Sequence, residues 1–82
     1  MVHVYYFGKL SDIAGHLSET IALPASVSDT QALRAWLDDK RGFDGALLHR
    51  TVRTAINSEI VIDPHPVNDE DEIAFLPPVG GG

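Results

Sequence analysis

A single amphipathic helix separates two groups of strand-like segments, and this arrangement restricts the folds open to the chain. The helix is predicted over residues 28–42, where apolar side chains recur on one face: Ala32, Leu33, Trp36 and Leu37. Ser28 and Gln31 match a capping box, and Gly42 supplies a stop signal at the other end. Because only one face is apolar, we expect this helix to cover one side of a sheet, with Trp36 in the core.

The remaining segments have mostly the composition of β-strands. Each of them has side chains that alternate between two faces, or is rich in β-branched and aromatic residues; they cover 2–7, 18–23, 52–56, 59–62 and 72–76. A short helix is expected over 9–14 and a weaker helical turn over 43–49. This order predicts an α+β fold of the β-grasp (ubiquitin-like) type, a roll whose mixed sheet packs on one main helix. We assign this domain to residues 1–76, and residues 77–82 to a flexible C-terminal tail.

The tail consists of two prolines, a valine and three glycines: Pro77, Pro78, Val79, Gly80, Gly81 and Gly82. Glycine has no Cβ, so a carboxylate carried on glycines can enter a narrow channel in conformations that other residues resist. The prolines stiffen the base of the tail, and the four residues beyond Pro78 span at most about 13 Å. The tail is therefore either a chemical handle for another protein or a frayed end without function.

Composition and charge argue against several classes of function. The 82 residues carry a net charge of −6, and the six basic residues are scattered, so nucleic-acid binding is not expected. An acidic surface suits a basic protein partner. No apolar run is long enough to span a membrane, and the N-terminus lacks the basic start of a signal peptide. We therefore expect a cytoplasmic protein that does not bind membranes.

Catalysis by side chains and metal binding are not expected. The chain has no cysteine, which excludes a disulfide, a thiolate nucleophile and a zinc–thiolate site. The acidic run 69–72 lacks the glycine and final glutamate of a calcium loop. The histidines have no metal-ligand spacing: His3, His16, His49 and His65. If this protein handles sulfur, the sulfur must be carried on the C-terminus.

Three motifs occur together in the chain, one at its start and two in its last third. They are the opening Val-Tyr-Tyr-Phe-Gly at 4–8, the Ala-Ile-Asn at 55–57, and the acidic turn, closing strand and Pro-Pro-Val-Gly-Gly-Gly ending at 69–82. In these motifs the chain resembles the MoaD family, the small sulfur-carrier subunits of molybdopterin synthase. Three residues depart from the pattern of that family: Glu70 replaces a usual glycine, Leu76 a common aromatic residue, and Gly80 a small or polar residue.

The resemblance implies a carrier that is not an enzyme on its own and binds no permanent cofactor. An adenylating enzyme would use ATP to activate the Gly82 carboxylate, and a sulfurtransferase or other persulfide donor would convert it to a thiocarboxylate. The large subunit of molybdopterin synthase would enclose Gly80 and Gly81, with Pro77, Pro78 and Val79 leading into its channel. Sulfur would then pass to cyclic pyranopterin monophosphate to form the molybdopterin dithiolene. Two carriers on a large-subunit dimer would make a heterotetramer.

Docking on the large subunit requires an apolar patch near the base of the tail. We predict that this patch contains Phe7, Phe75 and Leu76, with Ile60 beside them. Alternate residues of a strand point to opposite faces, so Phe75 and Leu76 can each be either interface or core.

Three other functions remain open for a chain with this ending. A ThiS-like sulfur carrier of thiamine synthesis is one, although the opening motif argues against it. A ubiquitin-like modifier, conjugated to lysines through Gly82, would share the same activation step. The third is an interaction domain whose glycine ending has no role.

Overall fold

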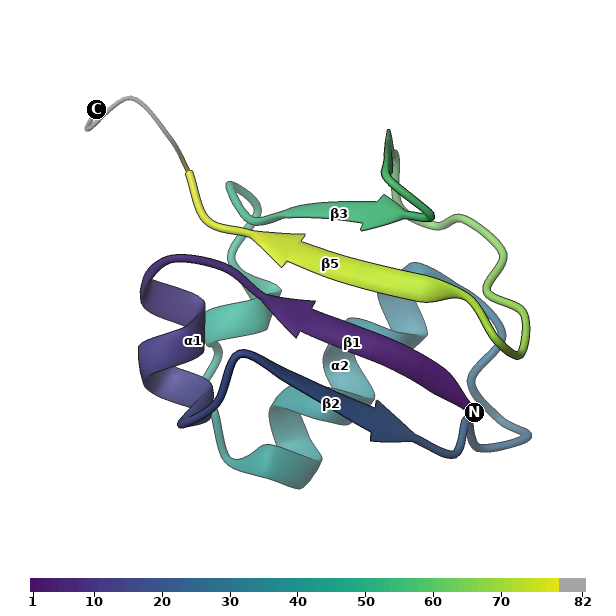
Figure 1. Cartoon of the computed structure of the whole chain (residues 1–82), viewed down its shortest axis with the longest axis horizontal. Helices are drawn as coiled ribbons and strands as arrows, with labels where there is room; N and C mark the ends of the chain where they lie inside the picture. The colour runs from purple at the N-terminus through teal and green to yellow at the C-terminus, as the bar shows by residue number, and fades with distance from the viewer. Residues whose placement is uncertain (79–82) are drawn as a thin grey trace.

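The computed structural model describes residues 1–78, in which helices cover one face of a five-stranded sheet (Figure 1). The elements follow in the order β1 (Val2–Tyr6), α1 (Lys9–Ala14), β2 (Ser18–Ile21), α2 (Thr30–Arg41), the 3₁₀ turn η1 (Ala46–Leu48), β3 (Arg53–Ile56), β4 (Glu59–Val61) and β5 (Glu72–Leu76). Every predicted strand and helix is present, and the bounds of the closing strand are as predicted.

The sheet is mixed, with the strand order β2-β1-β5-β3-β4. The first and last strands, β1 and β5, lie parallel at its centre, and every other pair is antiparallel. One row of the register runs from Tyr5 to Ala74, Ala55 and Ile60 across four strands. This strand order, with one main helix across the sheet, is the predicted β-grasp fold.

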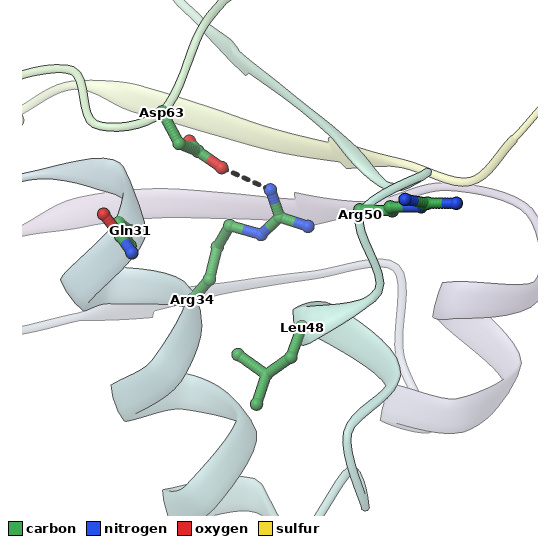
Figure 2. Close-up of a pocket in the computed structure, with 5 residues that line it drawn as sticks. All are labelled: Gln31, Arg34, Leu48, Arg50 and Asp63. Atoms are coloured by element: carbon green, nitrogen blue, oxygen red, sulfur yellow. Dashed lines mark hydrogen bonds and ion pairs between the residues drawn. The ribbon is translucent and has the colours of Figure 1, made fainter.

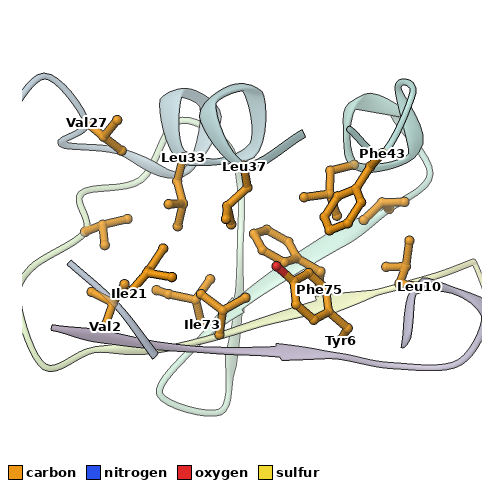
Figure 3. Close-up of a cluster of buried hydrophobic side chains, with 14 of the residues drawn as sticks. Val2, Tyr6, Leu10, Ile21, Val27, Leu33, Leu37, Phe43, Ile73 and Phe75 are labelled. Atoms are coloured by element: carbon orange, nitrogen blue, oxygen red, sulfur yellow. The ribbon is translucent and has the colours of Figure 1, made fainter. Parts of the chain in front are cut away.

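The core lies between the sheet and the helices (Figure 3). Alternate residues of each strand point into it, because successive side chains of a strand face opposite sides. Leu33 and Leu37 of α2 are fully buried against this layer, as the amphipathic pattern predicts. The strands supply the opposite side of the core: Val2, Val4, Tyr6, Ile21, Ile56, Ile73 and Phe75. Trp36 is half-buried against the edge of the core, with the Lys40 ammonium 5.3 Å from its ring centroid.

Helix α2 begins one residue later than the capping box predicts. Asp29, not Ser28, is the N-cap, and its side chain accepts a hydrogen bond from the Ala32 amide at 2.8 Å. The physical reason is tertiary, because the Val67 amide donates to the Ser28 carbonyl at 3.0 Å and keeps Ser28 in an extended pairing with the loop. The predicted stop at Gly42 is confirmed, with the backbone in the left-handed region at φ 69°.

Two side chains of α2 hold the irregular segment that follows the helix. The Asp38 carboxylate accepts from the Gly45 and Leu47 amides at 2.8 and 2.9 Å. The Arg34 guanidinium donates to the Leu47 and His49 carbonyls. It also forms an ion pair with Asp63, which Figure 2 shows. Both side chains are buried, so a segment with little regular structure is fixed by helix side chains that replace the missing backbone hydrogen bonds.

Two turns use positive φ angles at residues other than glycine. Asn57 and Ser58 join β3 to β4 at φ 50° and 74°, the combination typical of a tight hairpin. Glu70 has φ 72° at the position where the resemblance expects glycine. The acidic turn therefore keeps a left-handed backbone despite the substitution, which is unfavourable for a side chain with a Cβ.

Candidate functional site: the tail root and the open face

The tail leaves the sheet from its middle strand. We define the tail root as Leu76, Pro77 and Pro78, the last residues that the structure describes. The Phe7 amide donates to the Phe75 carbonyl at 3.2 Å, and this bond joins the ends of the two parallel strands just before the tail root. The tail root thus begins at the end of a strand that is hydrogen-bonded on both sides.

Gly8 lies against the tail root and explains the glycine of the opening motif. Its backbone has φ 55° and ψ −133°, a combination that is almost restricted to glycine. A Cβ at this position would lie 2.9 Å from Cγ of Pro77, closer than real Cβ contacts. The absence of a side chain therefore allows the chain to pass close to the first proline of the tail.

The face of the sheet opposite the helices is apolar near the tail root. We call this surface the open face; it consists of Tyr5, Phe7, Ala55, Ile60, Ala74 and Leu76. These side chains line a shallow groove of about 380 Å³. Ala74 and Ala55 lie between Tyr5 and Ile60 in one row of the register, so two small side chains separate two large ones. The arrangement is a shallow apolar surface that leads to the base of the tail.

The structure brings three of the four predicted docking residues together. Phe7 is 48% exposed and Ile60 62% exposed, and both line the open face with the half-buried Leu76. Phe75 is the exception, since it is fully buried and stacks on Tyr6 with 6.1 Å between the ring centroids. Placing its side chain in the docking patch is therefore wrong. The alternation of β5 assigns Phe75 to the core and Leu76 to the open face.

Two features of this site were missed by sequence reasoning. Tyr5 lies on the open face beside Phe7. The two residues are two positions apart, and strand alternation places such residues on the same face, so the sequence could have indicated Tyr5. The contact of Gly8 with Pro77 joins residues 69 positions apart, and no local pattern reveals it. The other predicted tail residues, Val79, Gly80, Gly81 and Gly82, lie outside the described residues.

A polar cluster at the edge of the core joins β1, β2 and α2. The Tyr6 hydroxyl donates to Oε2 of Glu19 at 2.7 Å, and Glu19 also pairs with Arg41 and with Nε2 of His16 at 3.3 Å. Burial, followed by the bond to Glu19, raises the pKa of Tyr6 far above its ordinary value. Burial alone would raise the pKa of Glu19, but the hydrogen bonds from its partners outweigh it and lower that pKa.

Neither a metal site nor a membrane-crossing helix is found in residues 1–78. Within this range, no three His, Asp or Glu side chains are grouped so that they could hold a metal ion. The helices of the same range are too short or too polar to cross a membrane.

Comparison with known proteins identifies relatives along the whole chain. A family model described as the ThiS family matches residues 4–82, which includes the last glycine. The molybdopterin synthase sulfur carrier subunit of Escherichia coli (strain K12) is 32% identical over 88 residues, and the match covers 100% of both chains.

Two solved structures with the same fold are a two-subunit complex and a small archaeal protein. A complex of subunits 1 and 2 of the molybdopterin-converting factor from Helicobacter pylori contains a chain 29% identical to this one, with a TM-score of 0.65 and coverage of 99% of this chain and 97% of that chain. SAMP1 from Haloferax volcanii has a TM-score of 0.77 over 99% of this chain and 98% of its own, at 19% identity. At that identity the second likeness shows the fold alone.

Proposed function

The chain belongs to the ThiS family, within its MoaD branch of molybdopterin synthase subunits, and from this premise we propose that it is the sulfur carrier of a molybdopterin synthase. In this function the Gly82 carboxylate is the only reacting group of the chain. The chain is not an enzyme on its own; it delivers sulfur to the active site of its partner, the large subunit.

The proposed chemistry converts a poor electrophile into a sulfur donor. The carboxylate of Gly82 attacks the α-phosphate of ATP in an adenylating enzyme, which releases pyrophosphate and forms an acyl adenylate. A persulfide sulfur then displaces AMP, and a thiol cleaves the acyl disulfide to leave the thiocarboxylate. Inside the large subunit, this sulfur passes to cyclic pyranopterin monophosphate, and two such transfers build the dithiolene.

The position of the tail root is the observation that carries this proposal. The tail leaves from the middle strand, beside an apolar surface, while the helices bury the core on the other side of the sheet. A partner can therefore bind the open face and receive the tail without disturbing the core. Backbone groups of glycines in a channel can pair with the partner like an added strand, which positions the reacting terminus.

The direct test is the intact mass of the chain after incubation with an adenylating enzyme, ATP and a persulfide donor. We expect a gain of about 16 Da, because sulfur replaces one carboxylate oxygen. A chain that lacks Gly82 is the matched control and should keep its mass. No gain in the full-length chain with a competent activating enzyme would contradict the proposal.

Two further assays of the activated chain distinguish a sulfur carrier from a ubiquitin-like modifier. A ubiquitin-like modifier would form covalent adducts with lysines when the activated chain is added to a lysate. A sulfur carrier forms the thiocarboxylate, and with the large subunit it converts the precursor pterin. Adducts without conversion of the pterin would favour the modifier.

A further inference from the structure

A second groove runs beside the tail root, along the β4 edge of the sheet. Its volume is about 930 Å³, and Leu76, Pro77 and Pro78 form part of its lining. The exposed side chains of Ile60 and Ile62 contribute apolar surface along the same edge. Any protein that encloses the tail must therefore pass next to this groove.

The groove concentrates positive charge in an acidic protein. Three arginines from different parts of the sequence line it, namely Arg34, Arg50 and Arg53, whereas Asp63 is the one carboxylate among its lining residues. The chain as a whole has a net charge of −6. Two basic side chains outside the groove are engaged elsewhere: Arg41 pairs with Glu19, and Lys40 lies over the ring of Trp36.

Only one of the three guanidinium groups is used by the fold. Arg34 donates to two backbone carbonyls and pairs with Asp63. Arg50 and Arg53 are exposed, and neither side chain has a hydrogen bond or ion pair with any residue between 1 and 78. Figure 2 shows Arg50 extending away from the Arg34–Asp63 pair. The free guanidinium groups therefore have no structural role within the described part of the chain.

We propose that Arg50 and Arg53 bind carboxylate side chains of the large subunit that receives the tail. A guanidinium group matches a carboxylate with two parallel hydrogen bonds, and its charge is permanent. The isoleucines beside the arginines favour a segment of the partner that combines acidic and apolar residues. The groove is continuous with the tail root, so this contact would align the tail with the channel of the partner. The inference rests on the proposed function.

Charge reversal tests the contact directly. Arg50→Glu and Arg53→Glu each change the net charge by the same amount as Lys40→Glu, which alters an exposed residue of α2 outside the groove. We expect each arginine variant to weaken binding to the large subunit about tenfold at low salt, and by less at high salt. Lys40→Glu should change the affinity less than about twofold, because it shifts only the long-range field.

The outcomes separate this inference from the proposed function. Titration calorimetry gives the affinity, and urea unfolding checks that all variants are folded. If the arginine variants bind as tightly as Lys40→Glu, the inference is wrong, although the sulfur carrier stands. If they bind the large subunit normally but accept less sulfur, the groove serves the activating enzyme and the inference is also wrong. If the wild-type chain does not bind the large subunit, both proposals fail.

Discussion

Gly8 is the residue whose identity the tail root depends on most. Two independent requirements meet there: a backbone conformation that is almost restricted to glycine, and a distance to Pro77 that leaves no room for a Cβ. Gly15 has a positive φ of 82° as well, but a Cβ there would meet no heavy atom within 4 Å. A side chain at Gly15 would meet backbone strain alone, whereas a side chain at Gly8 would meet both strain and a steric clash.

Gly8→Ala should lower the free energy of unfolding by about 3 kcal/mol, because strain and the clash with Pro77 act together. Gly15→Ala, the matched control, should lower it by about 1 kcal/mol through strain alone. Urea unfolding of both variants measures the difference. Equal losses would mean that the proline does not lie against Gly8.

Helix α2 stabilises more of the chain than its own apolar face. Arg34 connects it to the Leu47 carbonyl within η1, to the His49 carbonyl just after η1, and to Asp63 in the loop after β4. The side chains of Arg34 and Asp63 are 10% and 25% exposed, so the ion pair is largely shielded from water. Removal of the guanidinium would leave a shielded carboxylate and two carbonyls without their donors.

Arg34→Ala should therefore destabilise the protein by about 3 kcal/mol. Arg34→Lys should recover only part of this loss, since an ammonium group cannot reach three acceptors in the geometry of the guanidinium fork. Arg53→Ala is the control on an exposed arginine and should cost less than about 0.5 kcal/mol. Urea unfolding of the three variants measures these differences, and equal stability of the Arg34 and Arg53 variants would contradict the role of Arg34.

The stability of the folded domain should depend on pH through Glu19, which joins β2 to β1 and α2. The pKa of this carboxyl is lowered on folding, so the unfolded chain binds more protons as the pH falls. The contribution of Glu19 is complete above the ordinary pKa of 4.5 and is lost as the pH falls through the lowered value in the folded state. We expect Glu19→Gln to be less stable at pH 7 and to lose less stability than wild type between about pH 5 and pH 3. Thermal unfolding at several pH values measures this, and parallel curves would contradict it.

The open face should be the principal docking surface of the domain for the large subunit. Ile60→Asp places a charge on the open face, whereas Ile13→Asp places one on α1, on the helix side of the sheet, at a similar exposure of 50%. The first variant should weaken binding at least about tenfold, because a charge would be desolvated in an apolar contact. The control should bind within about twofold of wild type. Equal affinities in a pull-down or calorimetric titration would remove the open face from the interface.

Local patterns in the sequence were sufficient for the elements and for most of the fold. The alternation of 72–76 and the apolar stripe of α2 depend only on neighbouring residues, and both were predicted with nearly correct bounds. The start of α2 was misplaced because Ser28 and Asp29 are equally good caps, and pairing with the distant loop selects between them. The side chain of Phe75 was placed on the surface, although strand alternation together with Leu76 allows only one of the two there.

The glycine-rich ending and the family were readable from the chain itself, because the ending and the opening motif are continuous stretches of sequence. The surfaces beside the tail root were not, because they join residues that are far apart in the chain. Gly8 meets Pro77 only when β1 and β5 lie parallel. Three of the six basic residues that look scattered in the sequence gather in one groove when α2, the segment leading into β3 and the tail root come together. Such contacts depend on strand order and helix position, and those are decided by burial of the shared core.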